Sequence, residues 1–236
     1  MFDYTTENNL QIIQLLAGRC NVFAVIASNK KVLVIDTSTR PNQKNLFDKL
    51  DELTESGAEI DSCLLTHTHF DHSSNANALV EAYDTSLYCH ELEVPLALKG
   101  QSPQIQGASG FLKAVTTVFQ TPLMRIGAYP HIVSPDRCKN SLDIMHIDGN
   151  LTVLHTPGHS DGSISVIVDG EVALVGDAMI GASPRGIYPP FALDRNAVLR
   201  SWQALLDTDC RIYLPSHGRP VTAELLYEQL QVELEK

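Results

Sequence analysis

The chain has 236 residues, 44% of them hydrophobic, which is enough to build a buried core in one large domain or two small ones. No apolar run approaches the roughly 20 residues of a membrane-spanning helix, so we expect a soluble protein with no membrane partner. The formal net charge of −11 opposes binding to a nucleic-acid backbone and leaves a small-molecule substrate as the expected partner.

The N-terminus and the cysteines favour a cytoplasmic location. The opening "MFDYTTENNLQ" carries acidic residues and amides where a secretory signal would carry basic residues before an apolar core. The five cysteines are an odd number and form no CxxC pair, so we expect reduced thiols rather than disulfides.

The first third of the chain alternates strand and helix signals. The apolar spacing of residues 44–57 predicts a helix that ends at Gly57, and residues 74–84 open with Ser and Asn capping signals before a second helix. The rest of this part of the chain consists of β-branched and apolar runs separated by turn residues. These runs predict strands at 10–16, 21–27, 31–37, 60–66 and 86–90.

Residues 91–144 break this rhythm with several prolines and glycines around one apolar helical piece, 111–119. So irregular a segment in a compact domain is often a lid or a binding insertion, although a surface excursion without function fits equally well. The pieces 111–119 and 121–130 would then cover an acyl chain. Alternatively, they pack into the core or against a second copy in a homodimer.

The second half repeats the order of strand and helix signals seen in the first half. Strands are predicted at 151–156, 163–169 and 171–177, and two helices, 196–206 and 223–234, flank a last strand at 211–216. "NVFAVIASNKKVLVIDTS", a helix and "IDSCLLTH" are echoed by "GSISVIVDGEVALVGDAM", a helix and "CRIYLPSH".

This echo aligns Asp36 with Asp177 and His67 with His217. Either a gene duplication or a strand–turn–helix pattern common to many proteins would account for this similarity between the halves. Two βββαβ halves, packed sheet on sheet with helices outside, would form a four-layer αββα sandwich. We therefore expect one α/β domain over residues 1–236, with the irregular insertion at about 91–144.

Polar side chains crowd the end of one predicted strand, in "CLLTHTHFDH". Uncompensated polar groups at the end of a buried strand cost roughly 1–3 kcal/mol each, so something must satisfy them. The side chains of residues two apart on an extended strand point the same way, so His67 and His69 can bind the same ion. Asp71 and His72 follow and would face a second position. Imidazole and carboxylate groups are typical zinc ligands.

Further candidate ligands close apolar runs downstream. His159 follows a strand and a Pro–Gly turn, Asp177 ends the next strand, and His217 ends the last one beside a glycine. A lone histidine is more often a hydrogen-bonded structural residue. All of these elements together, in this order, favour a metal site.

The motifs "HTHFDH", "PGH", "GD" and "SHG" resemble the signature of the metallo-β-lactamase superfamily, HxHxDH followed by His, Asp and His. The resemblance implies the αββα fold and a dinuclear centre at one edge. It assigns His67, His69 and His159 to the first metal. It assigns Asp71, His72 and His217 to the second metal, with Asp177 bridging. Two divalent ions are implied, most readily zinc, with iron or manganese as alternatives.

The expected chemistry is hydrolysis. Two metals about 3.5–4 Å apart can hold a bridging water and lower its pKa from 15.7 towards about 7, which makes a hydroxide nucleophile, and Asp71 would orient it and move its proton. True β-lactamases of the superfamily commonly carry cysteine where this chain has Asp177, so the resemblance favours glyoxalase II-like and lactonase-like enzymes acting on small esters, lactones or thioesters. Ser74, Asn75 and Ser216 depart from the pattern common in those groups. We also expect no counterpart of the C-terminal helical extension of glyoxalase II proper.

Three other functions fit the same residues. They are a mononuclear iron enzyme similar to persulfide dioxygenases, a phosphodiester hydrolase, and a metal-stabilised binding module without turnover. Near the cleft, Arg185 and Arg195 could receive an anionic group and Tyr188 could hydrogen-bond an oxyanion, unless they are solvated loop residues. The remaining histidines are expected to be structural or substrate-facing: His90, His131, His146 and His155.

Overall fold

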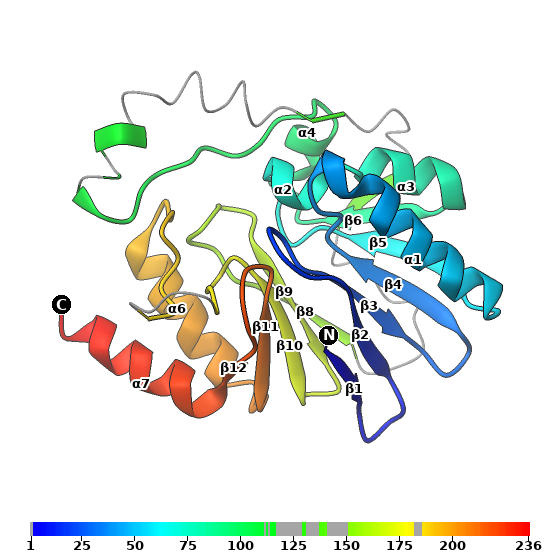
Figure 1. Cartoon of the computed structure of the whole chain (residues 1–236). Coiled ribbons are helices and arrows are strands. Elements are labelled where there is room, and N and C mark those ends of the chain that lie inside the picture. The colour runs from blue at the N-terminus through cyan, green and yellow to red at the C-terminus, as the bar shows by residue number, and fades with distance from the viewer. Residues whose placement is uncertain are drawn as a thin grey trace.

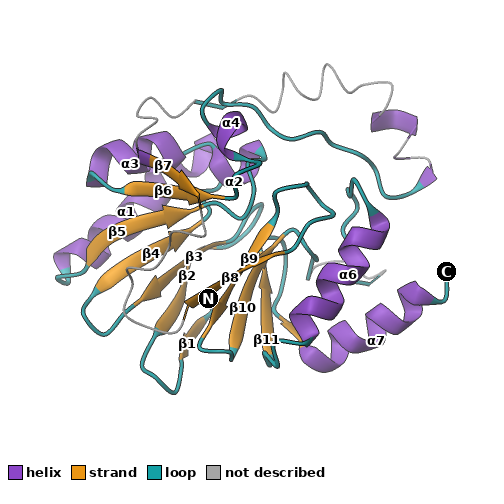
Figure 2. Ribbon diagram, turned by 180° about the vertical axis from the view of Figure 1, so that it is seen from behind, coloured by secondary structure: helices purple, strands orange, loops and turns teal. Residues whose placement is uncertain are grey.

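The computed structural model describes residues 2–110, 112, 114–116, 129–130, 137–140, 151–181 and 186–236. Within these residues the strands form two sheets, and helices cover the outer faces of both (Figure 1). The view from behind shows the same layers, with the two sheets lying between the helices (Figure 2).

The first sheet comes from the N-terminal part of the chain, and its strands lie in chain order, β1 to β7. Neighbours from β1 to β4 pair antiparallel, whereas β4, β5, β6 and β7 pair in parallel. The strands are β1 Asp3–Thr5, β2 Gln11–Leu16, β3 Val22–Ile26, β4 Lys31–Ile35, β5 Glu59–Leu64, β6 Ser86–Cys89 and β7 Cys138–Asn140.

The second sheet comes from the C-terminal part of the chain and has the order β12-β11-β10-β9-β8. Strands β8, β9 and β10 pair antiparallel, β10 and β11 pair in parallel, and β12 closes the edge antiparallel to β11. The strands are β8 Leu151–His155, β9 Ile164–Val168, β10 Val172–Gly176, β11 Ile212–Pro215 and β12 Val221–Thr222.

Three apolar clusters define the layers of the fold. One packs α1 and α3 against the first sheet, one fills the space between the two sheets, and one packs α6 and α7 against the second sheet. The four-layer αββα sandwich predicted from the sequence is therefore confirmed. The helices are α1 Gln43–Glu55, α3 Ala76–Tyr83, α6 Arg195–Leu206 and α7 Ala223–Leu234.

The two halves share one topology. Each has three antiparallel strands, a helix and a strand parallel to the third: β2-β3-β4-α1-β5 in the first half and β8-β9-β10-α6-β11 in the second. Asp36 follows β4 as Asp177 follows β10, and His67 follows β5 as His217 follows β11. Because parallel strands end at the same edge of a sheet, the four residues emerge at the carboxyl ends of equivalent strands.

The irregular segment 91–144 contributes two elements that the sequence pattern did not predict. Helix α4 (Val94–Ala97) follows β6, and the short, polar β7 extends the first sheet. Residues 112 and 114–116 are helical, in agreement with the predicted apolar helix, and the rest of 111–119 lies outside the described residues. No helix in the described part of the chain is long and apolar enough to cross a membrane.

Candidate metal centre

The loop after β5 places the first four candidate ligands. The Thr66 amide donates to the carboxylate of Asp36 at 2.8 Å, which turns the chain as soon as the strand has ended. The short helix α2 (Phe70–Ser73) then begins with His69 as its extended N-cap. His67 therefore lies in the bend after β5 and His69 on extended backbone, while Asp71 and His72 lie on the helix.

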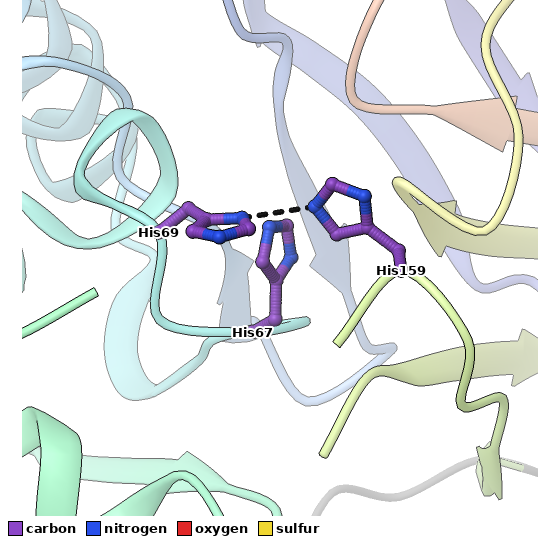
Figure 3. A group of neighbouring side chains, drawn as sticks. All are labelled: His67, His69 and His159. Carbon is purple, nitrogen blue, oxygen red and sulfur yellow. Dashed lines mark hydrogen bonds between the residues drawn. The ribbon is translucent and has the colours of Figure 1, made fainter. Parts of the chain in front are cut away.

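Three histidine rings meet at one point of this edge (Figure 3). His69 Nδ1 lies 2.9 Å from His159 Nε2, and the His67 ring stands edge-on to both. His159 Nδ1 lies 2.9 Å from the carbonyl oxygen of Phe191. Since a carbonyl only accepts, Nδ1 carries the proton, and the Nε2 lone pair of His159 faces the cluster.

Gly158 sets the position of His159. It adopts a φ of +131°, which is in the region that favours glycine, and a Cβ there would lie 2.5 Å from the backbone nitrogen of Val198 in α6. The "PGH" turn can therefore approach α6 closely only because it contains glycine.

A second group gathers Asp71, His72 and His217. His217 Nε2 lies 3.5 Å from Asp71 Oδ2, and His72 Nε2 lies 3.9 Å from Asp71 Oδ1. His72 Nδ1 is 2.8 Å from the Asp36 carboxylate, so Nδ1 donates there and Nε2 is left to face the group.

Asp177 lies between the two groups. Its Oδ2 is 3.5 Å from His159 Nε2, and its Oδ1 is 3.6 Å from His72 Nε2 and 3.4 Å from His217 Nε2. Gly176 brings this carboxylate close to the first sheet, because it has a φ of +53° and a Cβ would lie 2.6 Å from Thr66 Oγ1. All seven predicted ligands therefore lie in one continuous cluster.

The cluster fits divalent metal ions. Among the described residues, His67 Nε2, His72 Nε2 and Asp177 Oδ1 are buried and have no hydrogen-bond partner, which is costly unless something else binds them. Two ligand atoms at 2.0–2.1 Å from a tetrahedral zinc ion lie about 3.3–3.4 Å apart. The separations of 3.4–3.6 Å between Asp177 and its three histidines are close to that value.

The two groups differ in protonation. Burial and the neighbouring histidines hold the pKa of His67 well below its ordinary value, and the same causes lower that of His69 to about 3. Burial also disfavours the charged form of His217, but Asp177 and Asp71 outweigh burial and raise its pKa to about 10. Burial likewise disfavours the charged form of His72, but Cys20, Asp177 and Asp36 outweigh burial and raise its pKa.

Metal binding is therefore expected to release protons from His72 and His217 but not from His67 and His69. A histidine ligand must be neutral, so at pH 7 an ion at His67 and His69 displaces no proton from these residues, whereas an ion at His72 and His217 displaces one from each. The affinity of the group that contains His72 and His217 for a metal ion should rise with pH until His217 has lost its proton, near pH 10. Zinc titration by calorimetry in buffers of different ionisation enthalpy measures this release. The His217→Gln variant should release one proton fewer than the parent. Release of equal numbers of protons on binding of the first and the second zinc ion would contradict the assignment.

Two buried carboxylates that the sequence analysis did not assign to the site hold the ligand loops in place. Asp36 follows β4 with a φ of +61° and accepts from Thr66, from His72 and, at 2.9 Å, from the Ser216 hydroxyl. It therefore joins the end of β5, helix α2 and the residue before His217.

Glu93 joins the other two loops. Its Oε2 accepts from the amide and the hydroxyl of Thr68, between the first two histidines. Its Oε1 accepts from the Ser160 hydroxyl at 2.7 Å, directly after His159. One buried carboxylate thus fixes the spacing between the loops that carry the three-histidine group.

Glu93→Ala should therefore weaken metal binding at the three-histidine group about 10- to 100-fold, the usual cost of losing an outer partner of a metal ligand. The exposed neighbour supplies a matched control, since Glu91→Ala should leave both affinities unchanged. Competition against a chromophoric chelator measures the two affinities. If Glu93→Ala and Glu91→Ala bind metal like the parent, Glu93 does not position the histidines.

Other residues considered for the site lie elsewhere. Arg195 donates to the backbone carbonyl and the carboxylate of Glu233 in α7, and Tyr188 packs edge-to-face on Trp202, so neither joins the cluster. The rings of His90 and His155 stack on each other at 4.2 Å and also lie outside it. His131, His146 and Arg185 lie outside the described residues.

Comparison with known proteins defines the class to which this fold and cluster belong. Residues 16–217 match the sequence profile of the metallo-beta-lactamase superfamily. The fold is similar to that of a metallo-beta-lactamase superfamily protein from the archaeon Sulfolobus tokodaii, with a TM-score of 0.69 and 19% identity over 95% of this chain and 86% of the other. The chain belongs to the metallo-beta-lactamase superfamily.

Within the superfamily, the chain is similar to several hydrolases. The chain is 26% identical to the probable metallo-hydrolase YflN of Bacillus subtilis (strain 168), over 71% of this chain and 68% of that protein. It is 27% identical to the hydroxyacylglutathione hydrolase GloC of Haemophilus influenzae, over 76% of this chain and 79% of that protein. The protein is thus a metal-dependent hydrolase with a His/Asp cluster suited to metal.

Proposed function

We propose that the protein is a dinuclear hydrolase of small esters, lactones or thioesters. The observation that carries this proposal is the position of Asp177, whose two oxygens face nitrogen atoms of both groups at 3.4–3.6 Å. His67, His69 and His159 would hold one ion, Asp71, His72 and His217 the other, and Asp177 both. The similarity to a hydroxyacylglutathione hydrolase supports an acyl substrate.

When bound, two divalent ions would lower the pKa of an attacking water and polarise a carbonyl oxygen. Asp71 is the residue that we propose to move the proton. Burial raises the pKa of its carboxyl group, but His72 and His217 outweigh burial and lower it to about 2. At neutral pH the carboxylate is therefore an anion that can only accept. It takes the proton at a carboxylate oxygen and returns it to the leaving oxygen or sulfur.

The chain's own residues also hold this geometry rigid. Asp36 and Glu93 fix the loops that carry the ligands. His67 and His72 are fully buried, whereas the side chains of Asp71 and His217 are 24% and 26% exposed. A small-molecule substrate is proposed in preference to nucleic acid because the chain carries a net charge of −11.

A substrate panel with metal analysis tests the proposal. The chain, loaded separately with zinc, manganese and iron, is assayed against esters, lactones, thioesters and phosphodiesters. About two metal ions per chain and turnover of the carbonyl substrates are expected. One iron with oxygen uptake would instead identify a persulfide dioxygenase-like enzyme, and phosphodiester turnover a phosphodiesterase. No turnover with any metal would identify a binding module.

A further inference from the structure

Two arginines line a pocket beside α2, the helix that carries Asp71 and His72. This arginine pocket has a volume of about 570 Å³ and is lined by Arg19, Arg40, Pro41, Phe70, Ser74 and Tyr129, among others. Arg19 belongs to the turn between β2 and β3, and Arg40 begins a short 3-10 helix, Arg40–Asn42, between β4 and α1. Two cations thus come together from segments that are separate in the sequence.

Neither arginine has a protein partner among the described residues. The guanidinium groups of Arg19 and Arg40 make no hydrogen bond or ion pair there, although the chain carries 28 acidic residues against 17 basic ones. Planar guanidinium groups match carboxylate and phosphate oxygens with paired hydrogen bonds. Two unpaired arginines facing one pocket therefore point to an oxyanion ligand.

The turn that carries Arg19 packs against His72 from the Nδ1 side, where the ring also contacts Asp36. Cys20 Sγ, on the next residue, lies 3.7 Å from His72 Nδ1. Since consecutive Cα atoms are about 3.8 Å apart, the Arg19 Cα lies within roughly 10 Å of the His72 ring. Asn21 then bonds to the backbone around His217, because its amide donates to Ser216 and its side chain donates to Gly218.

The segment that carries Arg40 is also held close to His72. The Thr37 amide and hydroxyl both donate to the carbonyl oxygen of His72, at 2.6 and 2.7 Å. The Asn75 side chain donates to the carbonyl oxygens of Thr37 and Thr39. Because Phe70 and Ser74 are four residues apart, at either end of α2, the pocket lies along the helix that carries Asp71 and His72.

We propose that the arginine pocket binds an oxyanion group, a carboxylate or a phosphate, on the part of the substrate that does not react. The proposal rests on the proposed hydrolase function and narrows it to esters or thioesters with an anionic substituent. Phe70, Pro41 and Tyr129 form apolar walls that suit the carbon chain between the two ends of the substrate. Phe70 lines the pocket and directly precedes Asp71, and the Asp71 side chain is 24% exposed. One small molecule can therefore extend from the pocket to the exposed side of the cluster.

Inert dicarboxylates test the pocket without turnover. Calorimetry on the zinc-loaded protein compares the series from succinate to suberate with monocarboxylates of the same carbon number. One carboxylate would bind at the metal centre and the second at the arginines. At least one dicarboxylate should bind tenfold tighter than its monocarboxylate. The double variant Arg19→Gln/Arg40→Gln should lose this advantage. Replacing glutarate by 4-phosphonobutyrate shows which oxyanion the pocket prefers.

The control is Arg200→Gln/Arg211→Gln, which removes the same total charge from exposed positions outside the pocket and should keep the advantage. All four substitutions lie at exposed side chains, where effects on folding are small. Equal affinity for both series at every length, or an advantage that survives in the Arg19→Gln/Arg40→Gln variant, would overturn the proposal. A parallel assay compares glutaryl and pentanoyl thioesters. Absence of any turnover would contradict the hydrolase function, while the affinity comparison would still decide the pocket.

Discussion

His67→Ala should reduce the metal content from about two ions to about one and lower turnover by more than about 100-fold. That factor is the upper range for losing an outer partner of a ligand, and His67 is proposed as a direct ligand. The histidine is fully buried, and its Nε2 has no partner among the described residues.

The measurement combines metal analysis with turnover at saturating substrate. His155→Ala supplies the matched control, because this histidine is exposed and stacks on His90 outside the cluster. Circular dichroism establishes that both variants are folded. Unchanged metal content and unchanged turnover in a folded His67→Ala protein would remove His67 from the centre.

Asp177→Asn should weaken both metals at once. The substitution keeps the size of the side chain but removes the negative charge that faces His159 on one side and His72 and His217 on the other. We expect metal content after dialysis to fall towards one ion per chain or below, and turnover to fall by about 100-fold or more. Excess metal in the assay should restore part of the loss.

Asp209→Asn removes the same charge from an exposed turn and should match the parent. Asp209 has a φ of +60°, which asparagine tolerates well, so the control adds no backbone strain. Loss of one ion with the other bound as tightly as in the parent would mean that Asp177 binds a single metal and does not bridge.

The sequence predicted the layers and the order of the candidate ligands because both have strong local signals. Apolar runs mark the strands, and each of His159, Asp177 and His217 closes one of them. The short strands were harder to predict. β7 has only three residues, two of them polar, and its pairing with β6 depends on a chain excursion of nearly fifty residues.

The supporting contacts could not be predicted, since no periodic pattern marks them. Glu93 lies 25 residues from Thr68 and 67 from Ser160, and a single glutamate after a strand carries no signal of its own. Arg195 shows the opposite error. In the sequence it follows the loop beside Asp177 and suggests a substrate contact, but the packing of α6 on α7 pairs it with Glu233.

The cluster draws its members from both sheets. The first sheet supplies His67, His69, Asp71 and His72, and the second supplies His159, Asp177 and His217. Neither half carries a complete proposed ligand set for either ion, so tight metal uptake has to wait until the halves have docked. Bound metal would then link the two halves and stabilise their correct docking. A chain whose halves have docked wrongly would lack a complete proposed ligand set for either ion.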